Sequence, residues 1–314
     1  MSTAFIFPGQ GSQSVGMGRS LADTFPAARE VFEEVDAALS QKLSALMWDG
    51  PSEELTLTAN AQPALMAVSL AVIRVLEAEA DLDLKRDAAF VAGHSLGEYS
   101  ALAAAGTFSI GDAARLLRIR GDVMQKAVPA GEGAMAALLG SDLALAREIA
   151  EQAAQGEICE AANDNGGGQV VLSGSKAAVE RAIALSAERG VKRAMLLPVS
   201  APFHCALMAP AAEAMREALA KVAMQAPVVP VMANVGAAPL SGPEAIRDSL
   251  VRQVTGTVRW RECVEAMVAA GVTSFVEAGS GKVLAGLGKR IAPSATTVSV
   301  GTTDDITTYK AGRA

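Results

Sequence analysis

Ser95 lies at the centre of GHSLG (residues 93–97), which fits the G-x-S-x-G pattern of a nucleophile elbow. An apolar run precedes the segment and a helix-forming run follows it, so the serine would lie on a sharp strand–turn–helix connection. Gly93 and Gly97 suit such a turn because they have no side chain to clash. At a helix N-terminus, free N–H groups and the helix dipole favour developing negative charge. The segment predicts a nucleophilic serine; the alternative is a chance match, since the chain contains 29 glycines.

A serine nucleophile needs a base, and the chain contains two histidines. His94 directly precedes Ser95, so its side chain should point away from the hydroxyl and support the turn. His204, in PVSAPFHCALM (198–208), is then the candidate base. Cys205 follows it and raises the alternative of a Cys–His pair, which we disfavour because neighbouring side chains diverge.

No acidic residue is placed to complete a Ser–His–Asp triad. Between Gln169 and His204 the acids are Glu180 and Glu188, and both fall on one predicted helix. A backbone carbonyl can fix the tautomer of a histidine as a carboxylate does. Such a carbonyl is the alternative orienting group for His204.

Two further glycine-rich segments raise the question of phosphate binding. FPGQGSQ (7–13) does not complete G-x-G-x-x-G, because residue 14 is Ser. GSGKV (279–283) lacks the first glycine of a P-loop, and Val283 replaces the Ser or Thr that would hold magnesium. Nucleotide hydrolysis is therefore disfavoured. FPGQGSQ is better suited to bring the Gln10 N–H close to the elbow as part of an oxyanion hole.

The composition is that of a globular protein with a sizeable core. Of 314 residues, 51% are hydrophobic and 19% charged, and the formal net charge of −7 argues against a nucleic-acid partner. Three widely spaced cysteines (Cys159, Cys205 and Cys263) form no metal-ligand pattern and indicate a reduced, cytoplasmic chain. The N-terminus lacks a secretory-signal pattern. The longest apolar stretch (64–73) is too short to span a bilayer and predicts a buried helix, so we expect neither a metal nor a membrane partner.

Short apolar runs alternate with helical patterns along most of the chain, which favours a mostly parallel sheet covered by helices on both faces. The expected strands are 4–7, 88–93, 228–233, 273–278 and 296–300. The expected helices lie near 26–39, 60–79, 96–106, 109–126, 243–254 and 260–270. Ser109 with Asp112 gives the fourth helix a capping box. The polar tail after Gly301 is expected to be frayed.

The middle of the chain follows a different order. Strand, helix, strand, strand, helix and strand patterns occupy 134–139, 142–154, 157–162, 169–174, 176–190 and 192–197. This βαββαβ order is ferredoxin-like. Pro129 marks its entry and Pro198 its exit. We therefore expect an α/β fold in which residues 1–127 and 199–314 form a large catalytic subdomain and residues 128–198 form a small inserted one.

Five segments, taken in order, resemble the malonyl-CoA:acyl carrier protein transacylases of bacterial type II fatty-acid synthesis. They are FPGQGSQSVGMG, GHSLGEYSAL, RGDVMQKAVPAGEGAMAALLG, PVSAPFHCALM and GSGKVLAGLGKR, and the resemblance extends from about residue 4 to 292. GHSLGEYSA is far more specific than the bare G-x-S-x-G. The resemblance implies an α/β-hydrolase-like large subdomain with a mostly parallel sheet and a ferredoxin-like insert.

The resemblance also implies catalytic roles for individual residues. Ser95 would be the acylated nucleophile, and His204 would be its general base. The backbone N–H groups of Gln10 and Leu96 would form the oxyanion hole. The backbone carbonyl of Gln253 would orient the histidine, which would explain the missing Asp.

Three more residues are implied in substrate binding. Arg120, in RIRGDVMQ, would grip the malonyl carboxylate. Asn163 and Gln169 would line the cleft between the subdomains, although the glycines at 166–168 replace a proline that is frequent in the family. Ser280 also departs from the usual proline of GPGK, at a position with no implied catalytic role.

The implied reaction is ping-pong transfer of malonyl from malonyl-CoA to the phosphopantetheine thiol of acyl carrier protein, without a cofactor or metal. A trans-acting acyltransferase of a polyketide pathway shares every motif. A thioesterase or other serine hydrolase would use the same elbow, and a non-catalytic docking module would form no acyl-serine. Carrier proteins and this chain are both acidic, so docking would need a local basic patch; candidates are Lys192, Arg193, Lys282, Lys289 and Arg290.

Overall fold

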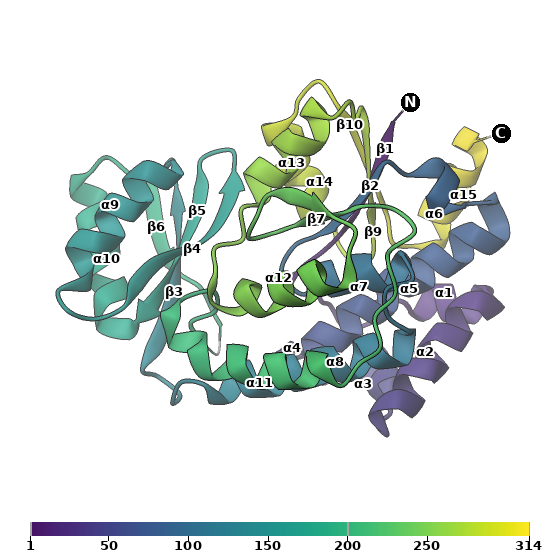
Figure 1. Cartoon of the computed structure of the whole chain (residues 1–314), viewed down its shortest axis with the longest axis horizontal. Coiled ribbons are helices and arrows are strands. Elements are labelled where there is room, and N and C mark those ends of the chain that lie inside the picture. Colours follow the sequence, from purple (N-terminus) through teal and green to yellow (C-terminus); the bar gives the residue numbers. More distant parts are fainter. Residues whose placement is uncertain (1, 200, 314) are drawn as a thin grey trace.

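The computed structural model describes residues 2–199 and 201–313, and six strands of these residues form the larger of two sheets (Figure 1). The strands are β1 (Thr3–Phe7), β2 (Phe90–Gly93), β7 (Val231–Ala233), β8 (Ala238–Leu240), β9 (Ser274–Ala278) and β10 (Thr296–Val300). Their spatial order is β10-β9-β1-β2-β7-β8. All neighbours are parallel except β7 and β8, which form an antiparallel hairpin at one edge. The predicted mostly parallel sheet is confirmed.

Strand β1 shows why the apolar runs are uninterrupted. Phe5 and Phe7 belong to one buried cluster, whereas Ala4 and Ile6 belong to a second. Successive side chains of a strand point to opposite faces, so a strand covered on both sides is apolar at every position.

Helices cover both faces of this sheet. The first cluster includes side chains from α1 (Arg19–Thr24), α2 (Pro26–Leu39), α3 (Leu43–Asp49), α4 (Ser52–Thr56), α5 (Thr58–Ala80), α6 (Leu84–Asp87), α7 (Gly97–Ala104), α8 (Ile110–Lys126), α11 (Ala209–Ala220), α12 (Pro243–Thr255) and α15 (Thr303–Arg313). The second cluster includes side chains from α13 (Trp260–Ala269) and α14 (Val283–Ile291).

Helix α5 is long and strongly apolar. Its length and composition would allow it to cross a membrane, but 89% of its most apolar window is buried inside the protein. It packs against α2, α7 and α8. A helix that is apolar all round and enclosed by protein is a core helix. The prediction of a buried helix is confirmed, although the helix is longer than the apolar run that predicts it.

The second sheet contains β3 (Gly133–Leu139), β4 (Cys159–Gly166), β5 (Gln169–Ser175) and β6 (Arg193–Leu196) in the order β4-β5-β3-β6, and all neighbours are antiparallel. Helices α9 (Leu143–Ala154) and α10 (Lys176–Glu188) pack on this sheet around a separate core (Figure 1). The chain order is βαββαβ, as predicted. The subdomain boundaries at residues 128 and 198 stay a prediction.

Strand β4 joins the smaller part to the larger one. The Asp164 N–H donates to the Val258 oxygen at 2.9 Å, and the Val258 N–H donates to the Ala162 oxygen at 2.8 Å. A side-chain ion pair between Arg261 Nε and Asp164 Oδ2, at 2.9 Å, adds to this junction. The outer edge of β4 is therefore paired with the segment that leads into α13.

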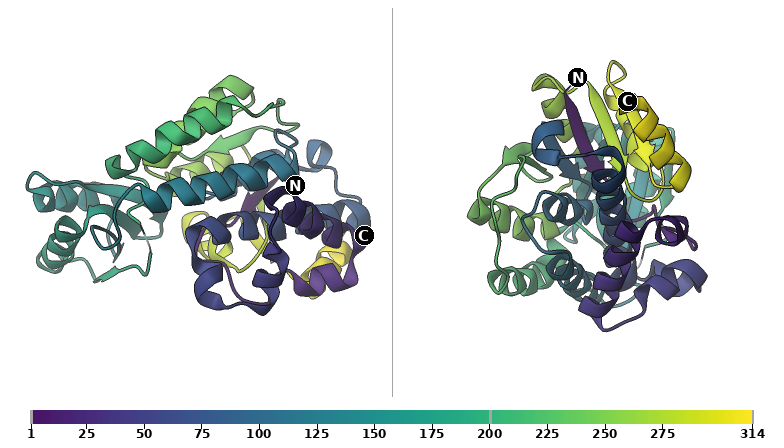
Figure 2. Two further views of the ribbon diagram at one scale, coloured as in Figure 1. Left: turned by 90° about the horizontal axis from the view of Figure 1, so that it is seen from below. Right: turned by 90° about the vertical axis from the view of Figure 1, so that its right-hand side faces the viewer.

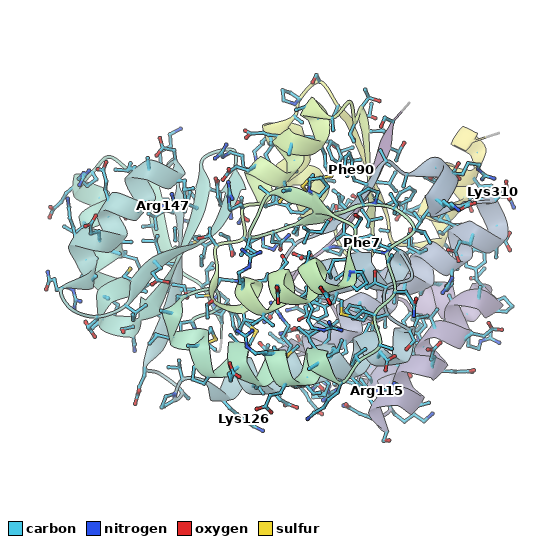
Figure 3. The ribbon with its side chains drawn as sticks, in the orientation of Figure 1. Phe7, Phe90, Arg115, Lys126, Arg147 and Lys310 are labelled. Carbon is cyan, nitrogen blue, oxygen red and sulfur yellow. The ribbon has the colours of Figure 1, made fainter. Side chains whose placement is uncertain are left out.

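Helix α8 carries the chain from the larger part to the smaller one. It packs beside α11, and both helices extend toward the smaller part (Figure 2). Arg115 and Lys126 lie on its outer side (Figure 3), whereas Arg120 is buried. One arginine of this helix therefore faces inward.

The prediction of a frayed C-terminal tail is wrong. Residues 303–313 form α15, and Ile306 is only 2% exposed against the core. The Thr302 N–H donates to Asp305 Oδ2, and the Asp305 N–H donates to Thr302 Oγ1. This reciprocal capping pattern starts a helix in a polar segment. Helices α11 and α14 are also absent from the predicted elements. Both are short, and α14 contains Gly286 and Gly288, residues of low helix propensity.

Candidate active site

Ser95 occupies the turn between β2 and α7 with a left-handed backbone, at φ 53°. This region is uncommon for a residue with a side chain, and such strain clusters at functional sites. The turn is also tight. A Cβ atom on Gly93 would lie 1.9 Å from the carbonyl of Gly97, and one on Gly97 would lie 2.3 Å from the oxygen of Phe7. Glycine is therefore required on both sides of the serine.

His204 lies within hydrogen-bond distance of this serine. Its Nε2 atom is 2.8 Å from Ser95 Oγ, and its Nδ1 atom is 2.8 Å from the backbone oxygen of Gln253. A carbonyl oxygen only accepts, so Nδ1 carries the ring proton and Nε2 is free to take the serine proton. Burial, and then the charge of Arg120, lower the pKa of His204 to about 3, which keeps the ring neutral. The geometry is that of a serine with its general base.

The guanidinium of Arg120 lies on the other side of the hydroxyl. It is 2% exposed and donates to Ser95 Oγ at 3.0 Å, to Gln62 Oε1 at 2.8 Å and to Gln253 Oε1 at 3.0 Å. Its Nε atom has no hydrogen-bond partner among residues 2–199 and 201–313, and no carboxylate of those residues forms a salt bridge with it. Burial lowers its pKa, because an unpaired charge is costly away from water.

Gln10 and Leu96, whose backbone N–H groups are the predicted oxyanion hole, both lie beside the same space as Ser95. Leu96 is the N-cap of α7, and Gln10 lies in the loop after β1. Within the described part of the chain, neither N–H donates a hydrogen bond. The loop packs closely on the elbow, since a Cβ atom on Gly9 would lie 2.8 Å from the His94 oxygen. The Gln10 side chain also donates to Thr58 Oγ1 at 3.2 Å, which anchors the loop.

A cavity of about 420 Å³ lies at these groups. Apolar side chains that line it include Met124, Met135, Leu197 and Phe203. The Asn163 Oδ1 atom is buried and lacks a hydrogen-bond partner among the described residues, so it is an acceptor available to a ligand. Six of the eight predicted site residues line the cavity: Gln10, Ser95, Leu96, Arg120, Asn163 and His204.

The structure does not bring Gln169 to this cavity. Gln169 begins β5 and pairs with Leu139 and Gly166, beside the turn of the β4–β5 hairpin. The three glycines at 166–168 all have positive φ, and they place the turn against Ile291 and Arg290 of α14. The hairpin end therefore lies at α14 and not at the serine.

Residues 4–303 match the acyl transferase domain family. The chain belongs to this family. It is 49% identical over 293 residues, 93% of this chain and 94% of the relative, to the malonyl CoA-acyl carrier protein transacylase of Escherichia coli K12.

Two solved structures are similar along nearly their whole length. The acyl-carrier-protein S-malonyltransferase of Bartonella henselae has 58% identity and a TM-score of 0.97, covering 100% of this chain and 99% of that one. A malonyl-transacylase in complex with a type II polyketide synthase acyl carrier protein has 42% identity and a TM-score of 0.96, covering 99% and 100%. The α/β fold with its smaller antiparallel part is the fold of these acyl transferases.

His94 and Cys205, which the sequence does not favour as general base and nucleophile, have other partners in this acyl transferase. His94 Nε2 lies 2.8 Å from Asn165 Oδ1 on β4, so this ring bridges the two parts. Cys205 is buried and donates to the Pro202 oxygen. Burial raises the pKa of its thiol to about 11, which disfavours the thiolate.

A buried polar network behind the serine was not predicted. Asn234 accepts from the Ser95 N–H at 2.8 Å and donates to the Gly93 oxygen at 2.7 Å, so it clamps the elbow from both sides. The Gln253 side chain donates to the Ser95 oxygen at 3.0 Å and to Glu98 at 2.9 Å. Glu98 follows the elbow directly in GHSLGE. A charged residue inside an otherwise apolar helix pattern is the sequence feature that could have indicated this buried network.

Proposed function

We propose that this acyl transferase moves the malonyl group of malonyl-CoA to the phosphopantetheine thiol of acyl carrier protein through a malonyl-Ser95 intermediate, and so supplies fatty-acid biosynthesis. The observation that carries the proposal is the buried Arg120 guanidinium, which lies 3.0 Å from Ser95 Oγ and whose hydrogen-bond partners within the described part of the chain are neutral. An acyl group that ends in a carboxylate supplies the missing anion. The planar fork of arginine can donate two parallel hydrogen bonds to its two oxygens. The names of the relatives described above support the same substrates.

In the first half-reaction Ser95 Oγ attacks the thioester carbonyl while His204 Nε2 takes the hydroxyl proton. The carbonyl electron pair moves to the oxygen, which accepts hydrogen bonds from the Gln10 and Leu96 N–H groups. One such donor is worth about 2.7–4 kcal/mol in other enzymes. The carbonyl then re-forms, the C–S bond breaks, and the CoA sulfur leaves with the proton from His204. Arg120 holds the malonyl carboxylate during these steps.

The second half-reaction reverses the first with a new thiol. The phosphopantetheine thiol gives its proton to His204 and attacks the Ser95 ester. The C–O bond breaks, and the serine oxygen recovers its proton from His204. The free Asn163 Oδ1 can accept a hydrogen bond from an amide of the pantetheine arm. This scheme uses no cofactor or metal.

The acceptor could equally belong to a polyketide pathway. One similar malonyl-transacylase was solved with a type II polyketide synthase carrier protein, which favours this as the second candidate. The chemistry at Ser95 is the same in both cases, so the two candidates differ in the carrier protein that docks. Both candidate functions imply a cytoplasmic location, and the three free, buried cysteines support that location.

Carrier docking would use the basic patch of Lys192, Arg193, Lys282, Lys289 and Arg290, all of which are exposed. The glycine turn at 166–168 brings members of this patch together. Gly167 packs against Arg290, while Gly168 accepts from the N–H of Gly140, which packs against Lys192. Long-range attraction between this patch and an acidic carrier would overcome the net charge of −7.

The test is a brief incubation with malonyl-CoA followed by intact and peptide mass spectrometry. We expect malonyl on Ser95 in the wild type and none in Ser95→Ala. Adding purified carrier protein should move the label to its thiol, whereas a thioesterase would release free malonate at the same rate with or without the carrier. A chain that never acquires malonyl on Ser95 would be a docking module, and the proposal would fail.

A further inference from the structure

Glu98 is a buried acid that the reaction scheme does not use. It lies in the first turn of α7, three residues after Ser95, and is 1% exposed. Its Oε2 atom accepts from the Asn234 N–H at 3.0 Å and from Gln253 Nε2 at 2.9 Å. Both partners also bond the elbow, so this carboxyl group stands behind the nucleophile and away from the cavity.

The Gln253 amide connects this acid to the cation of the site. Its Nε2 atom donates to Glu98, and its Oε1 atom accepts from Arg120 Nη2 at 3.0 Å. A carboxylate only accepts and a guanidinium only donates, so these two groups fix the same orientation of the amide. The Arg120 guanidinium and the Glu98 carboxyl group are thus linked through a neutral spacer, and among the residues that the structure describes no carboxylate forms a direct ion pair with this guanidinium.

We propose that Glu98 is a positioning residue for substrate choice. Acting through Gln253, it fixes the amide oxygen toward Arg120, and its negative charge moderates how strongly Arg120 attracts the carboxylate of the acyl group. The inference rests on the proposed function, because it assumes that Arg120 binds a malonyl carboxylate. A direct pair between Glu98 and Arg120 would compete with the substrate, whereas the spacer leaves the guanidinium open.

The charge of Glu98 changes near neutral pH. Burial raises its pKa to about 7, against the opposing effects of its hydrogen bonds and of Arg120. The other ionisable groups that face it are Tyr99 and Cys263, whose pKa values burial raises further above neutrality. His204, beyond Gln253, has a pKa of about 3 and stays neutral. A bound carboxylate is repelled by ionised Glu98, so its binding favours the protonated acid, and preference for malonyl should fall as pH rises through 7.

The experiment measures kcat/KM for malonyl-CoA and for acetyl-CoA between pH 6 and 8.5 and follows their ratio. The phosphates of CoA titrate near pH 6 but are common to both substrates, so they cancel in the ratio. In the wild type the ratio should fall by about threefold or more across this range. Glu98→Gln keeps an acceptor for both hydrogen bonds and removes the charge, so its ratio should be flat and higher than that of the wild type at pH 8.5.

Glu277→Gln is the matched control. Glu277 is also a buried acid whose pKa burial raises, but it accepts from the N–H groups of Leu284 and Ala285 at the start of α14. This variant should keep the pH dependence of the wild type.

Two results would overturn the inference. One is a wild-type ratio that does not change with pH, which can be measured even if Glu98→Gln does not fold. The other is a Glu98→Gln variant that lowers both substrates by one factor and keeps the wild-type slope, which is the behaviour of a residue that only supports the fold. If the wild type forms no malonyl-Ser95, the proposed function fails instead. If Arg120→Ala does not change the ratio, the premise that Arg120 binds the carboxylate fails, and the malonyl-Ser95 intermediate is unaffected.

Discussion

Arg261 and Arg120 lie in contrasting surroundings. Arg261 on α13 is 35% exposed and is paired with Asp164 at 2.9 Å and with Glu265 at 2.7 Å. Arg120 on α8 is 2% exposed, and its partners are two amide oxygens and the Ser95 hydroxyl. The carboxylates paired with Arg261 allow it to stabilise the junction between β4 and α13. Arg120 is held in place by neutral groups and forms no salt bridge with a carboxylate of the described residues, so in the proposed function the substrate supplies the anion.

The largest effect should come from replacing His204, the candidate general base in the region of Arg120. His204→Ala removes the side chain that lies 2.8 Å from Ser95 Oγ and can take its proton, so kcat should fall about a thousandfold or more. Cys205→Ser is the neighbouring control and should stay close to the wild type, because its thiol bonds a backbone oxygen and is buried. Single-turnover acylation by malonyl-CoA measures both. An inactive Cys205→Ser with an active His204→Ala would reverse the assignment.

The second largest effect should come from replacing Arg120 itself. Arg120→Ala should lower kcat/KM for malonyl-CoA by about tenfold to a hundredfold, because a charge-assisted hydrogen bond is worth about 1.5–3 kcal/mol and a stranded carboxylate costs more. The kcat/KM for acetyl-CoA should fall little. Arg120→Lys should recover only part of the malonyl activity, since an ammonium group has no planar fork. Equal losses for the two substrates would mean that Arg120 supports the fold and that the carboxylate binds elsewhere.

A change at the junction between β4 and α13 should alter the free energy of unfolding and not the preference between malonyl-CoA and acetyl-CoA. Asp164→Asn removes the buried charge that faces Arg261, and we expect a loss of about 1–2 kcal/mol in the free energy of unfolding, reduced because Arg261 is partly exposed. Urea unfolding measures this loss. The malonyl-to-acetyl ratio should stay at the wild-type value, and a changed ratio would show that the two regions are coupled.

The smallest effect should come from the exposed cations. Raising the salt concentration should increase KM for carrier protein more than it lowers kcat, because screening weakens attraction between exposed charges beyond about 10 Å at 0.1 M salt. The malonyl-CoA half-reaction on Ser95, measured without carrier, serves as the control. A carrier KM that does not respond to salt would rule out the basic patch as the docking surface.

The elbow was predictable because its determinants are local. Gly93, Ser95 and Gly97 lie within five residues, and the tight turn between them has few solutions. His204 followed by elimination, since only two histidines are present, and the resemblance supplied Arg120 and the Gln253 carbonyl. The β4–β5 hairpin was harder, because three successive glycines with positive φ set the direction of its turn. The sequence alone therefore did not show that Gln169 lies outside the lining of the cavity at Ser95.

The network behind the elbow needed the folded chain. Asn234 and Gln253 reach Ser95 from loops and helices more than a hundred residues away, and neither carries a local signature. The C-terminal helix is a different case. Its Thr302–Asp305 capping pattern was present in the sequence, but the polar composition of the segment outweighed it.

The pairing of β4 with Val258 has a consequence for solution behaviour. An unpaired strand edge is a template for association with another chain, and β4 escapes this because the segment before α13 covers it. At the opposite edge of the same sheet, β6 is only four residues long and begins at Arg193, next to Lys192. Short length and positive charge protect that edge in place of a covering segment. Reversing these two charges to test carrier docking would therefore also weaken a safeguard against self-association, so the monomer content of such variants must be measured before their kinetics are compared.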